Sequence, residues 1–311
     1  MIEVPAALAR AQAKYEGDAG RAFVAALPGH AADFLARWRL RRTGPARHGM
    51  TALVLPVVRE RDGTPAALKL QLLTAESEGE AAALAAWAGD GAVRLLAHGE
   101  ADGTGVLLLE AADPAADLDG LPARRAVEII ARLLARLTSR SAPAGVRSLA
   151  DGTARMLAGI GDVPPAFPHA PLLRECAAVV REVVDEPGDR LLHWDLHFRN
   201  VLGSRRPTGD GGEDAWLAID PKPLAGHPGF DLFPALRNRF DPDDVAARFD
   251  LMTGILGLDR ARARAWTLAR VLQQGLWAWR DGEPLGEDEA FVGRTLLARG
   301  AVSGQGGGHD S

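Results

Sequence analysis

Cysteine is almost absent from the 311-residue chain, which contains only Cys176. A lone cysteine cannot form an intrachain disulfide, and the apolar neighbours of Cys176 favour a buried thiol over a nucleophile. Long apolar runs are also absent, since no stretch reaches the roughly 20 residues that a membrane-spanning helix needs. The first residues lack the basic start and apolar run of a signal peptide. We therefore expect a soluble cytoplasmic protein with no membrane partner.

Basic residues do not exceed acidic ones: 36 Lys and Arg stand against 41 Asp and Glu, a formal net charge of -5. The basic surface that is typical of nucleic-acid binding is therefore not expected. Hydrophobic residues make up 47% and charged residues 25%, the balance of a globular chain rather than a disordered one. At this length we expect one large domain or two lobes, and a monomer.

Lysine is the scarce cation. Lys14, Lys69 and Lys222 are the only lysines among the 36 basic residues, and all the others are arginines. In a chain rich in alanine and glycine this imbalance indicates coding bias. A lysine that remains against such a background marks a position at which arginine is unsuitable.

Hydrophobic periodicity divides the first third of the chain into helices and a small sheet. The first ~45 residues read as helical, with Pro5 and Pro28 suited to first turns. Two β-like runs around a polar turn predict a hairpin, and a helix is expected over 76–87. The expected strands are 51–58, 66–71, 93–98, 106–109 and one near Leu40.

After residue 110 the pattern is mainly helical, with a short β-rich patch. We expect helices at 124–137, at 172–184 and from about 232 onward, strands within 191–202 and 216–219, and a loop over 159–171. The predicted fold class is α+β in two lobes. Its parts are an N-terminal lobe (1–109), a hinge (110–112), a helical C-terminal lobe (113–300) and a disordered tail (301–311).

The segment HWDLHFRN (193–200), followed by WLAIDP (216–221), carries the chemistry. Asp195 lies in a loop, Asn200 follows five residues later, and Asp220 ends the next expected strand. Flanking strands would hold Asn200 and Asp220 close together at the same mouth. Two oxygen ligands beside a carboxylate base indicate a site for a hard divalent metal and phosphate.

These residues resemble the catalytic loop of the protein-kinase-like fold, and more closely that of the aminoglycoside phosphotransferase superfamily. HWDLH, WLAIDPKPL (216–224), GFDL (229–232) and AWAGDGAVRLL (86–96) are similar to its streptomycin 6-kinase and hydroxyurea phosphotransferase branch. The resemblance spans roughly residues 20 to 297. It implies a bilobal fold with a small antiparallel-sheet lobe and a mainly helical lobe.

The resemblance also implies roles for individual residues of the helical lobe. Asp195 would be the base that receives the proton of the acceptor hydroxyl, and Asn200 and Asp220 would hold Mg²⁺ against the phosphates of ATP. His193 would brace the loop, and Asp231 would secure its backbone.

In the smaller lobe the resemblance assigns the strand residue Lys69 to the nucleotide phosphates. Its expected partner is Glu80, with Glu76 as the alternative. The remaining nucleotide contacts that it implies are Gly49 over the phosphates, the hinge Glu110 to Ala112 at the adenine, and His197 where protein kinases place a phosphate-contacting lysine.

The acceptor is less constrained. A streptomycin-like acceptor is cationic and hydroxylated, so acidic side chains at the rim of the large lobe would attract it. The candidates are Asp241, Asp243, Asp244, Asp281, Glu283, Glu287, Asp288 and Glu289, for which charged surface loops are the alternative interpretation. The predicted activity is ATP- and Mg²⁺-dependent phosphorylation of the 6-hydroxyl of streptomycin, without a phosphoenzyme. The alternatives are a hydroxyurea or other metabolite kinase, or a nucleotide-binding pseudokinase.

Overall fold

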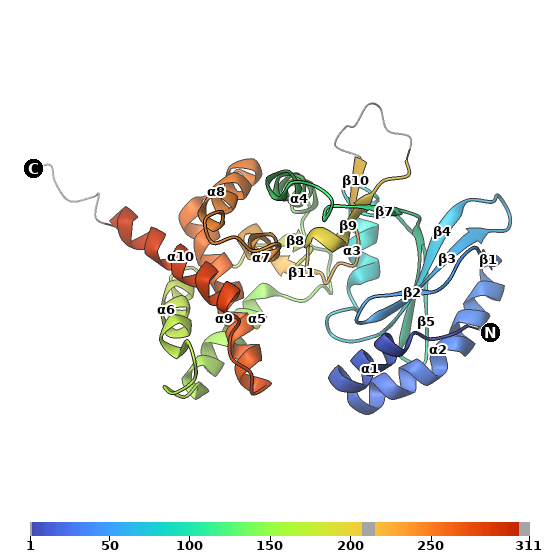
Figure 1. The fold of residues 1–311 in the computed structure, drawn as a ribbon, viewed down its shortest axis with the longest axis horizontal. Helices are drawn as coiled ribbons and strands as arrows, with labels where there is room; N and C mark the ends of the chain where they lie inside the picture. Colours follow the sequence, from blue (N-terminus) through green and yellow to red (C-terminus); the bar gives the residue numbers. More distant parts are fainter. Residues whose placement is uncertain (1, 207–214, 305–311) are drawn as a thin grey trace, which may run out of the picture.

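The computed structural model describes residues 2–206 and 215–304, which form a sheet-rich part and a helical part side by side (Figure 1). This arrangement confirms the predicted α+β fold of two unequal parts. None of the helices in the described ranges is long and apolar enough to cross a membrane.

The sheet-rich part is built on six strands, β1 (Leu40–Arg42), β2 (Arg47–His48), β3 (Ala52–Arg59), β4 (Pro65–Leu72), β5 (Leu95–Ala101) and β6 (Thr104–Glu110). Their order is β1-β3-β4-β6-β5, with β2 paired to the free part of β3. The antiparallel register of β3 on β4 confirms the predicted hairpin, with Val54 opposite Lys69. The sequence missed β2, because two residues are too short for an alternating pattern.

Two helices, α1 (Ala6–Tyr15) and α2 (Gly17–Arg37), cover one face of this sheet (Figure 1). The expectation that Pro28 begins a helix is wrong, since Pro28 lies inside α2. A proline there removes one backbone hydrogen bond. Burial of Phe23, Leu27 and Phe34 against the sheet offsets that cost.

Strand β6 belongs to two hydrophobic cores at once. Val106 and Leu108 lie in the core under α2, whereas Leu107 and Leu109 lie in the core that continues through the helical part. Alternate residues of a strand point to opposite faces, so one strand supplies both. Helix α3 (Glu80–Trp87) packs in the second core. It begins at Glu80 rather than at 76, because Thr74 and Ser77 form a turn through their side chains.

The helical part contains seven α-helices in the described residues: α4 (Ala123–Leu137), α5 (Leu149–Gly159), α6 (Ala170–Arg181), α7 (Phe233–Arg237), α8 (Val245–Leu256), α9 (Arg260–Arg280) and α10 (Glu287–Gly304). The expected helices at 124–137 and 172–184 correspond to α4 and α6, whereas α5 was not predicted. A 3-10 helix, η1 (Ile160–Asp162), lies within the expected loop. Helix α10 includes the first four residues of the predicted tail, and residues 305–311 lie outside the described ranges.

Short strands connect the helices near the centre of the molecule. They are β7 (Asp113–Asp117), β8 (Arg190–Leu192), β9 (Val201–Gly203), β10 (Trp216–Ala218) and β11 (Leu224–Gly226). Strands β10, β9 and β7 form one sheet and β11 pairs with β8. Only β8, β9 and β10 fall in the expected β-rich patch. The hinge at 110–112 stays a prediction, and the break between β6 and β7 lies at residues 111–112.

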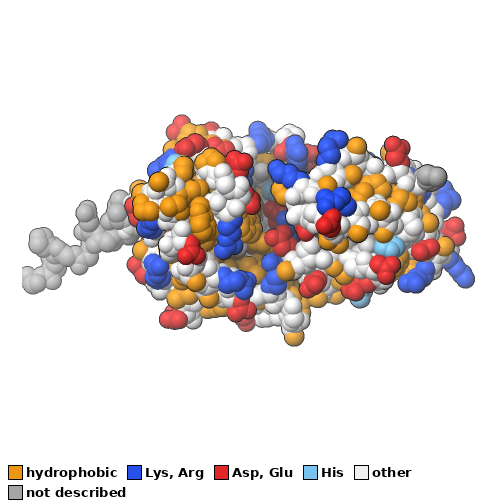
Figure 2. Space-filling view, turned by 90° about the horizontal axis from the view of Figure 1, so that it is seen from below, with side chains coloured by type: hydrophobic (Ala, Val, Ile, Leu, Met, Phe, Trp, Pro, Cys, Tyr) orange, Lys and Arg blue, Asp and Glu red, His pale blue; other side chains and the backbone are white. Residues whose placement is uncertain are grey.

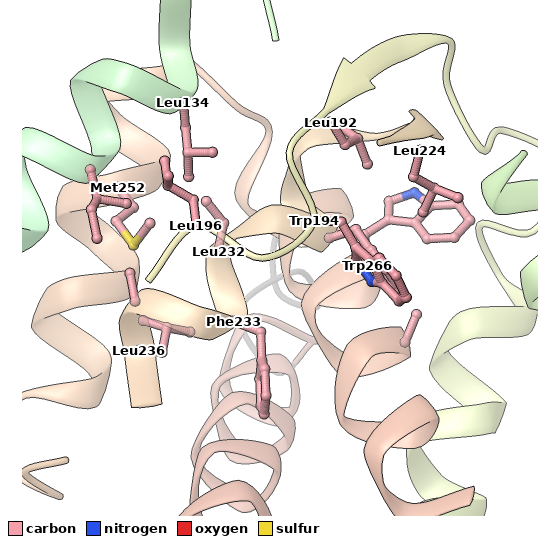
Figure 3. Close-up of a cluster of buried hydrophobic side chains, with 14 of the residues drawn as sticks. Leu134, Leu192, Trp194, Leu196, Leu224, Leu232, Phe233, Leu236, Met252 and Trp266 are labelled. Atoms are coloured by element: carbon pink, nitrogen blue, oxygen red, sulfur yellow. The ribbon is translucent and has the colours of Figure 1, made fainter. Parts of the chain in front are cut away.

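Helix α9 forms the centre of the larger core, part of which is drawn in Figure 3. Trp266, Leu272 and Leu276 are buried and Trp279 is partly buried, so these apolar residues of α9 face the core. Cys176 is also fully buried, and burial raises the pKa of its thiol to about 12. The thiol therefore stays protonated and belongs to the core.

Backbone and indole hydrogen bonds tie the two parts together. Val93 N–H donates to Ala218 O at 3.0 Å, and Ala218 N–H donates to Gly91 O at 2.9 Å. The indole of Trp87 donates to Leu137 O at 3.0 Å, which attaches α3 to α4. The end of α3 nearest the centre is thus fixed to both parts.

We predict that Trp87→Phe lowers the free energy of unfolding by about 1–3 kcal/mol, because it removes a buried hydrogen bond and leaves a void in the core. Urea unfolding followed by circular dichroism measures this loss. The matched control Trp38→Phe alters a half-buried ring beside Phe34 and should cost less. Equal losses in the two variants would contradict the anchoring role of Trp87.

Candidate active site

Asp231 holds the backbone of the loop that carries Asp195. This side chain is fully buried in the 3-10 helix η4 (Pro228–Leu232) and accepts hydrogen bonds from the N–H groups of His193 at 2.8 Å and Trp194 at 2.6 Å. Burial raises the pKa of Asp231 to about 7, although the two N–H donors act in the opposite direction. Asp231 therefore positions the start of the loop.

His193 joins this loop to the segment that ends in Asp220. Its Nε2 lies 3.0 Å from Ile219 O, and its Nδ1 lies 3.4 Å from the N–H of Asp195. Burial lowers the pKa of His193 to about 4, so the ring is neutral near pH 7. The carbonyl requires a donor, which places the proton on Nε2.

Asn200 and Asp220 lie together beside Asp195. The Asn200 side chain donates from Nδ2 to Asp195 O at 2.9 Å, and Ile219 N–H donates to Asn200 O at 2.9 Å. This orientation assigns Nδ2 to the loop and leaves Oδ1 out of that hydrogen bond. Asp220 has φ +57°, a left-handed conformation that aspartate tolerates better than most residues.

Lys69 connects the sheet to this loop region. Its Nζ lies 2.7 Å from both carboxylate oxygens of Glu80 and also donates to Asp220 Oδ1. The structure thus pairs Lys69 with Glu80, not with Glu76, and Gln71 supplies a further donor to Glu80. Burial opposes the charge of the ammonium, but Asp220 and Glu80 hold the pKa of Lys69 above its ordinary value. Lys69 in turn holds the pKa of the half-buried Asp220 carboxyl below its ordinary value.

The other residues expected at the nucleotide lie at or beside the ends of strands of the sheet-rich part. Gly49 lies in the turn between β2 and β3, where its N–H donates to Ala52 O at 3.2 Å. Ala112 lies in the connection between β6 and β7. The Glu110 carboxylate binds Arg206 and the N–H of Arg94, so this side chain braces the end of β6.

His197 does not supply the cation of the protein-kinase pattern. Burial lowers the pKa of His197, which keeps the imidazole neutral near pH 7. Its Nδ1 accepts the N–H of Arg199 at 3.2 Å and caps the 3-10 helix η2 (Phe198–Asn200). His197 is therefore a cap of the loop that carries Asp195.

Lys222 lies at the site, although sequence reasoning gave it no role. Its Nζ is 3.6 Å from Asp195 Oδ2 and 3.4 Å from Glu76 Oε2. Its backbone N–H donates to His193 O at 3.0 Å, which fixes its segment against the loop. The scarcity of lysine was the one signal in the sequence that could have identified it.

A pocket of about 610 Å³ opens beside Asp195, and Figure 2 shows the surface hollowed between the two parts. Its walls include four arginines and three aspartates. The charged lining residues are Arg199, Arg237, Arg239, Arg270, Asp119, Asp195 and Asp288.

Most of the acidic residues expected at the acceptor lie elsewhere. Asp288 lines the pocket, but Asp241, Asp244, Asp281 and Glu283 do not. Asp241 and Asp244 lie in the turn before α8, where Asp241 accepts the N–H of Asp243 at 3.1 Å. Asp281 and Glu283 follow the end of α9. Charge alone could not separate a pocket wall from a solvated turn.

Trp194 occupies an unusual backbone position for a bulky residue, with φ +68°. Such a conformation costs roughly 1–2 kcal/mol. The guanidinium groups of Arg147 and Arg270 each lie 4.8 Å from the ring centroid of this buried indole, which packs edge-on against Trp277. These contacts offset the cost and place Arg270 in the pocket wall.

The oxygen atoms of Asn200 and Asp220 fit a magnesium ion. Within the described residues no group of three His, Cys, Asp or Glu could hold a metal by itself. Magnesium prefers hard oxygen ligands and keeps positions for water and substrate phosphates, so one carboxylate and one amide oxygen suffice from the protein.

We predict that His193 contributes stability that is lost as the pH falls. Its unfolded pKa of 6.5 exceeds its folded value of about 4, so the unfolded state binds more protons between these values. The unfolding free energy of wild type minus that of His193→Gln should rise with pH over this window, by up to about 1.4 kcal/mol per unit. Urea titrations of both proteins at several pH values measure the difference, in which the opposite contribution of Asp231 cancels. A difference that does not change with pH would contradict the neutral ring.

Comparison with known proteins gives relatives over nearly the whole chain. The chain is 56% identical to the hydroxyurea phosphotransferase of Kitasatospora aureofaciens, over 96% of this chain and 87% of that protein. It is 44% identical to the streptomycin 6-kinase of Streptomyces glaucescens, over 91% and 92%. The crystal structure of aminoglycoside phosphotransferase APH(4)-Ia shares the fold, with a TM-score of 0.57, 13% identity, and coverage of 91% and 100%.

The family model described as aminoglycoside/hydroxyurea antibiotic resistance kinase matches residues 37–282. This range includes Lys69, the loop of Asp195 and the segment of Asp220. It confirms the resemblance carried by HWDLH and WLAIDPKPL. The chain therefore belongs to the aminoglycoside/hydroxyurea family of antibiotic resistance kinases.

Proposed function

We propose that the protein transfers the γ-phosphoryl group of ATP to the 6-hydroxyl of streptomycin, with Mg²⁺ as cofactor. The observation that carries the proposal is the position of Asp195. Its carboxylate lines the pocket of about 610 Å³, and its backbone oxygen holds Asn200 beside Asp220 and Lys69. A base that faces an acceptor pocket on one side and a phosphate site on the other can serve a direct transfer.

The proposed step is a single displacement. The acceptor hydroxyl gives its proton to the Asp195 carboxylate as its oxygen forms a bond to the γ-phosphorus. The bond from that phosphorus to the β–γ bridging oxygen breaks, and the electron pair stays on ADP. Asp195 accepts a proton and forms no covalent bond, so there is no phosphoenzyme. Magnesium, held by Asn200 Oδ1 and Asp220, would neutralise charge on the phosphate oxygens.

Lys69 would place a fixed charge at the nucleotide phosphates. Its ammonium is oriented by Glu80, at 2.7 Å from both oxygens, and points to Asp220. A charge that is already oriented loses little freedom when the nucleotide arrives. The nucleotide would lie in the cleft between β4 and the Asp220 segment, with Ala112 at the adenine end and Gly49 over the phosphates.

Two acceptors deserve direct comparison. The size of the pocket and its aspartates favour a large cationic acceptor such as streptomycin. Hydroxyurea is the second candidate, because the hydroxyurea phosphotransferase is 56% identical to this chain and four arginines line the pocket. Guanidinium groups in the wall repel the guanidinium groups of streptomycin but not an uncharged acceptor.

We predict ADP formation from ATP with streptomycin as acceptor, and a product that is one phosphate heavier. A coupled ADP assay with streptomycin, hygromycin B and hydroxyurea, followed by mass spectrometry and NMR of the product, identifies the acceptor and the position. Turnover with hydroxyurea alone would assign the alternative. Nucleotide binding without turnover of any acceptor would contradict a kinase for these compounds.

We predict that two carboxylate variants separate the two halves of the site. Asp195→Asn should lower kcat by roughly 10²–10⁴-fold while AMP-PNP still binds with Mg²⁺. Asp220→Asn should instead weaken that binding, because a metal ligand is lost. Calorimetry and steady-state kinetics measure both effects, and Asp33→Asn, at an exposed position of α2, is the control. An active Asp195→Asn enzyme would exclude Asp195 as the base.

A further inference from the structure

Two of the three lysines of the chain reach the same cleft from different elements. Lys69 enters from β4, and Lys222 enters from the connection between β10 and β11. The side chain of Lys222 is 31% exposed, whereas that of Lys69 is 5% exposed. Lys69 is already bound to Glu80 and Asp220, so Lys222 is the ammonium that is open to the cleft.

The Lys222 ammonium lies beside the base, on the segment that also carries the Asp220 carboxylate. Its Nζ is 3.6 Å from Asp195 Oδ2, and Lys222 follows Asp220 by two residues in the connection between β10 and β11. A phosphoryl group that moves from a nucleotide at Asp220 to a hydroxyl at Asp195 must cross the interval between these two carboxylates. Three phosphoryl oxygens carry the charge during that passage.

No other side chain of the Asp195 loop supplies a cation to that interval. The Nδ1 of His197 accepts the N–H of Arg199 at 3.2 Å, so this nitrogen carries no proton and the ring is not a cation. Arg199 is already paired, with its Nε 3.1 Å from the Asp119 carboxylate. An acceptor oxygen, a phosphoryl group and Asp195 would bring negative charge together, and a nearby cation reduces that repulsion.

We propose that the Lys222 ammonium binds the γ-phosphoryl oxygens and follows them during transfer, as a catalytic residue that the Asp195 loop itself does not provide. This inference rests on the phosphoryl transfer proposed above. In the step, the acceptor proton goes to Asp195, the new oxygen–phosphorus bond forms, and the bond to the β–γ bridging oxygen breaks. Lys222 remains protonated throughout and donates hydrogen bonds only.

A simpler role would be a bridge between the two parts of the molecule. Lys222 Nζ lies 3.4 Å from Glu76 Oε2 in the turn before α3, and the neighbouring Pro223 lies against Gly79. If this were its function, loss of either member of the pair would have the same effect. Glu76→Gln removes the bridge and keeps the ammonium, so the two roles can be separated.

The first test compares nucleotides with and without the γ-phosphate. Affinities for AMP-PNP and ADP, each with Mg²⁺, are measured by calorimetry for wild type, Lys222→Met, Lys222→Arg and Glu76→Gln. We expect Lys222→Met to weaken AMP-PNP about 10-fold or more and to leave ADP almost unchanged. Lys14→Met, which removes an exposed lysine of α1, is the matched control. Circular dichroism establishes whether each variant is folded. If Lys222→Met does not fold, Lys222→Arg, which keeps a cation of different shape, provides the comparison with wild type.

The second test is kinetic. With the acceptor identified above, Lys222→Met should lower kcat on the order of 10²-fold with little change in the KM of the acceptor. Lys222→Arg should recover part of that loss. Glu76→Gln should shift the two nucleotide affinities equally.

Equal weakening of AMP-PNP and ADP by Lys222→Met, matched by Glu76→Gln, would overturn the inference and leave only the bridge. The nucleotide affinities need no acceptor. A failure of the proposed acceptor and a failure of the Lys222 role are therefore distinguishable.

Discussion

The ammonium of Lys69 is the charge on which the arrangement of the cleft depends. It is buried in strand β4 and joins Glu80 of α3 to Asp220, which follows β10. Removal of one partner from such a group leaves an uncompensated buried charge, which lowers the free energy of unfolding by about 3–5 kcal/mol. Strand β4, helix α3 and the segment of Asp220 must therefore meet at one point. A separate hydrogen bond, from Ile219 N–H to Asn200 O, fixes the segment of Asp220 relative to Asn200.

Hydrophobic packing supports that point from both sides. Strand β6 places Val106 under α2 and Leu107 in the core of the helical part, so the sheet is not an independent lobe. Trp87 continues this connection from α3 to α4. The walls of the cleft are thus continuous with the core. The groups at its mouth, such as Lys222 and Asp195, are partly exposed and have room to adjust to a substrate.

Local pattern sufficed to predict the hairpin that carries Lys69, because alternation along two strands around a polar turn is a local signal. The pairing of Lys69 with Glu80 came instead from the family resemblance, since Glu76 lies on the same expected helix. Local pattern could not predict the place of Lys222, since the β10–β11 connection brings it to Asp195 only after the chain reverses. The pocket arginines come from separate elements, so no regular spacing in the sequence indicates that they line one pocket. Strand β2 has only two residues, too few to show the alternation of side chains by which a strand is predicted. Trp194 has a positive φ that is unfavourable for a bulky residue, and Arg147 and Arg270, whose contacts offset this cost, are distant from it in the sequence.

The contact between Lys69 and Asp220 has a consequence for how the metal arrives. Without substrate, the carboxylate that would bind magnesium already has a counter-ion built into the protein. A free ion would have to displace a buried ammonium and leave it without that partner. Magnesium carried by a nucleotide brings phosphate oxygens that can accept the released ammonium. Under the proposed function, this exchange would favour the metal–nucleotide complex over the bare ion.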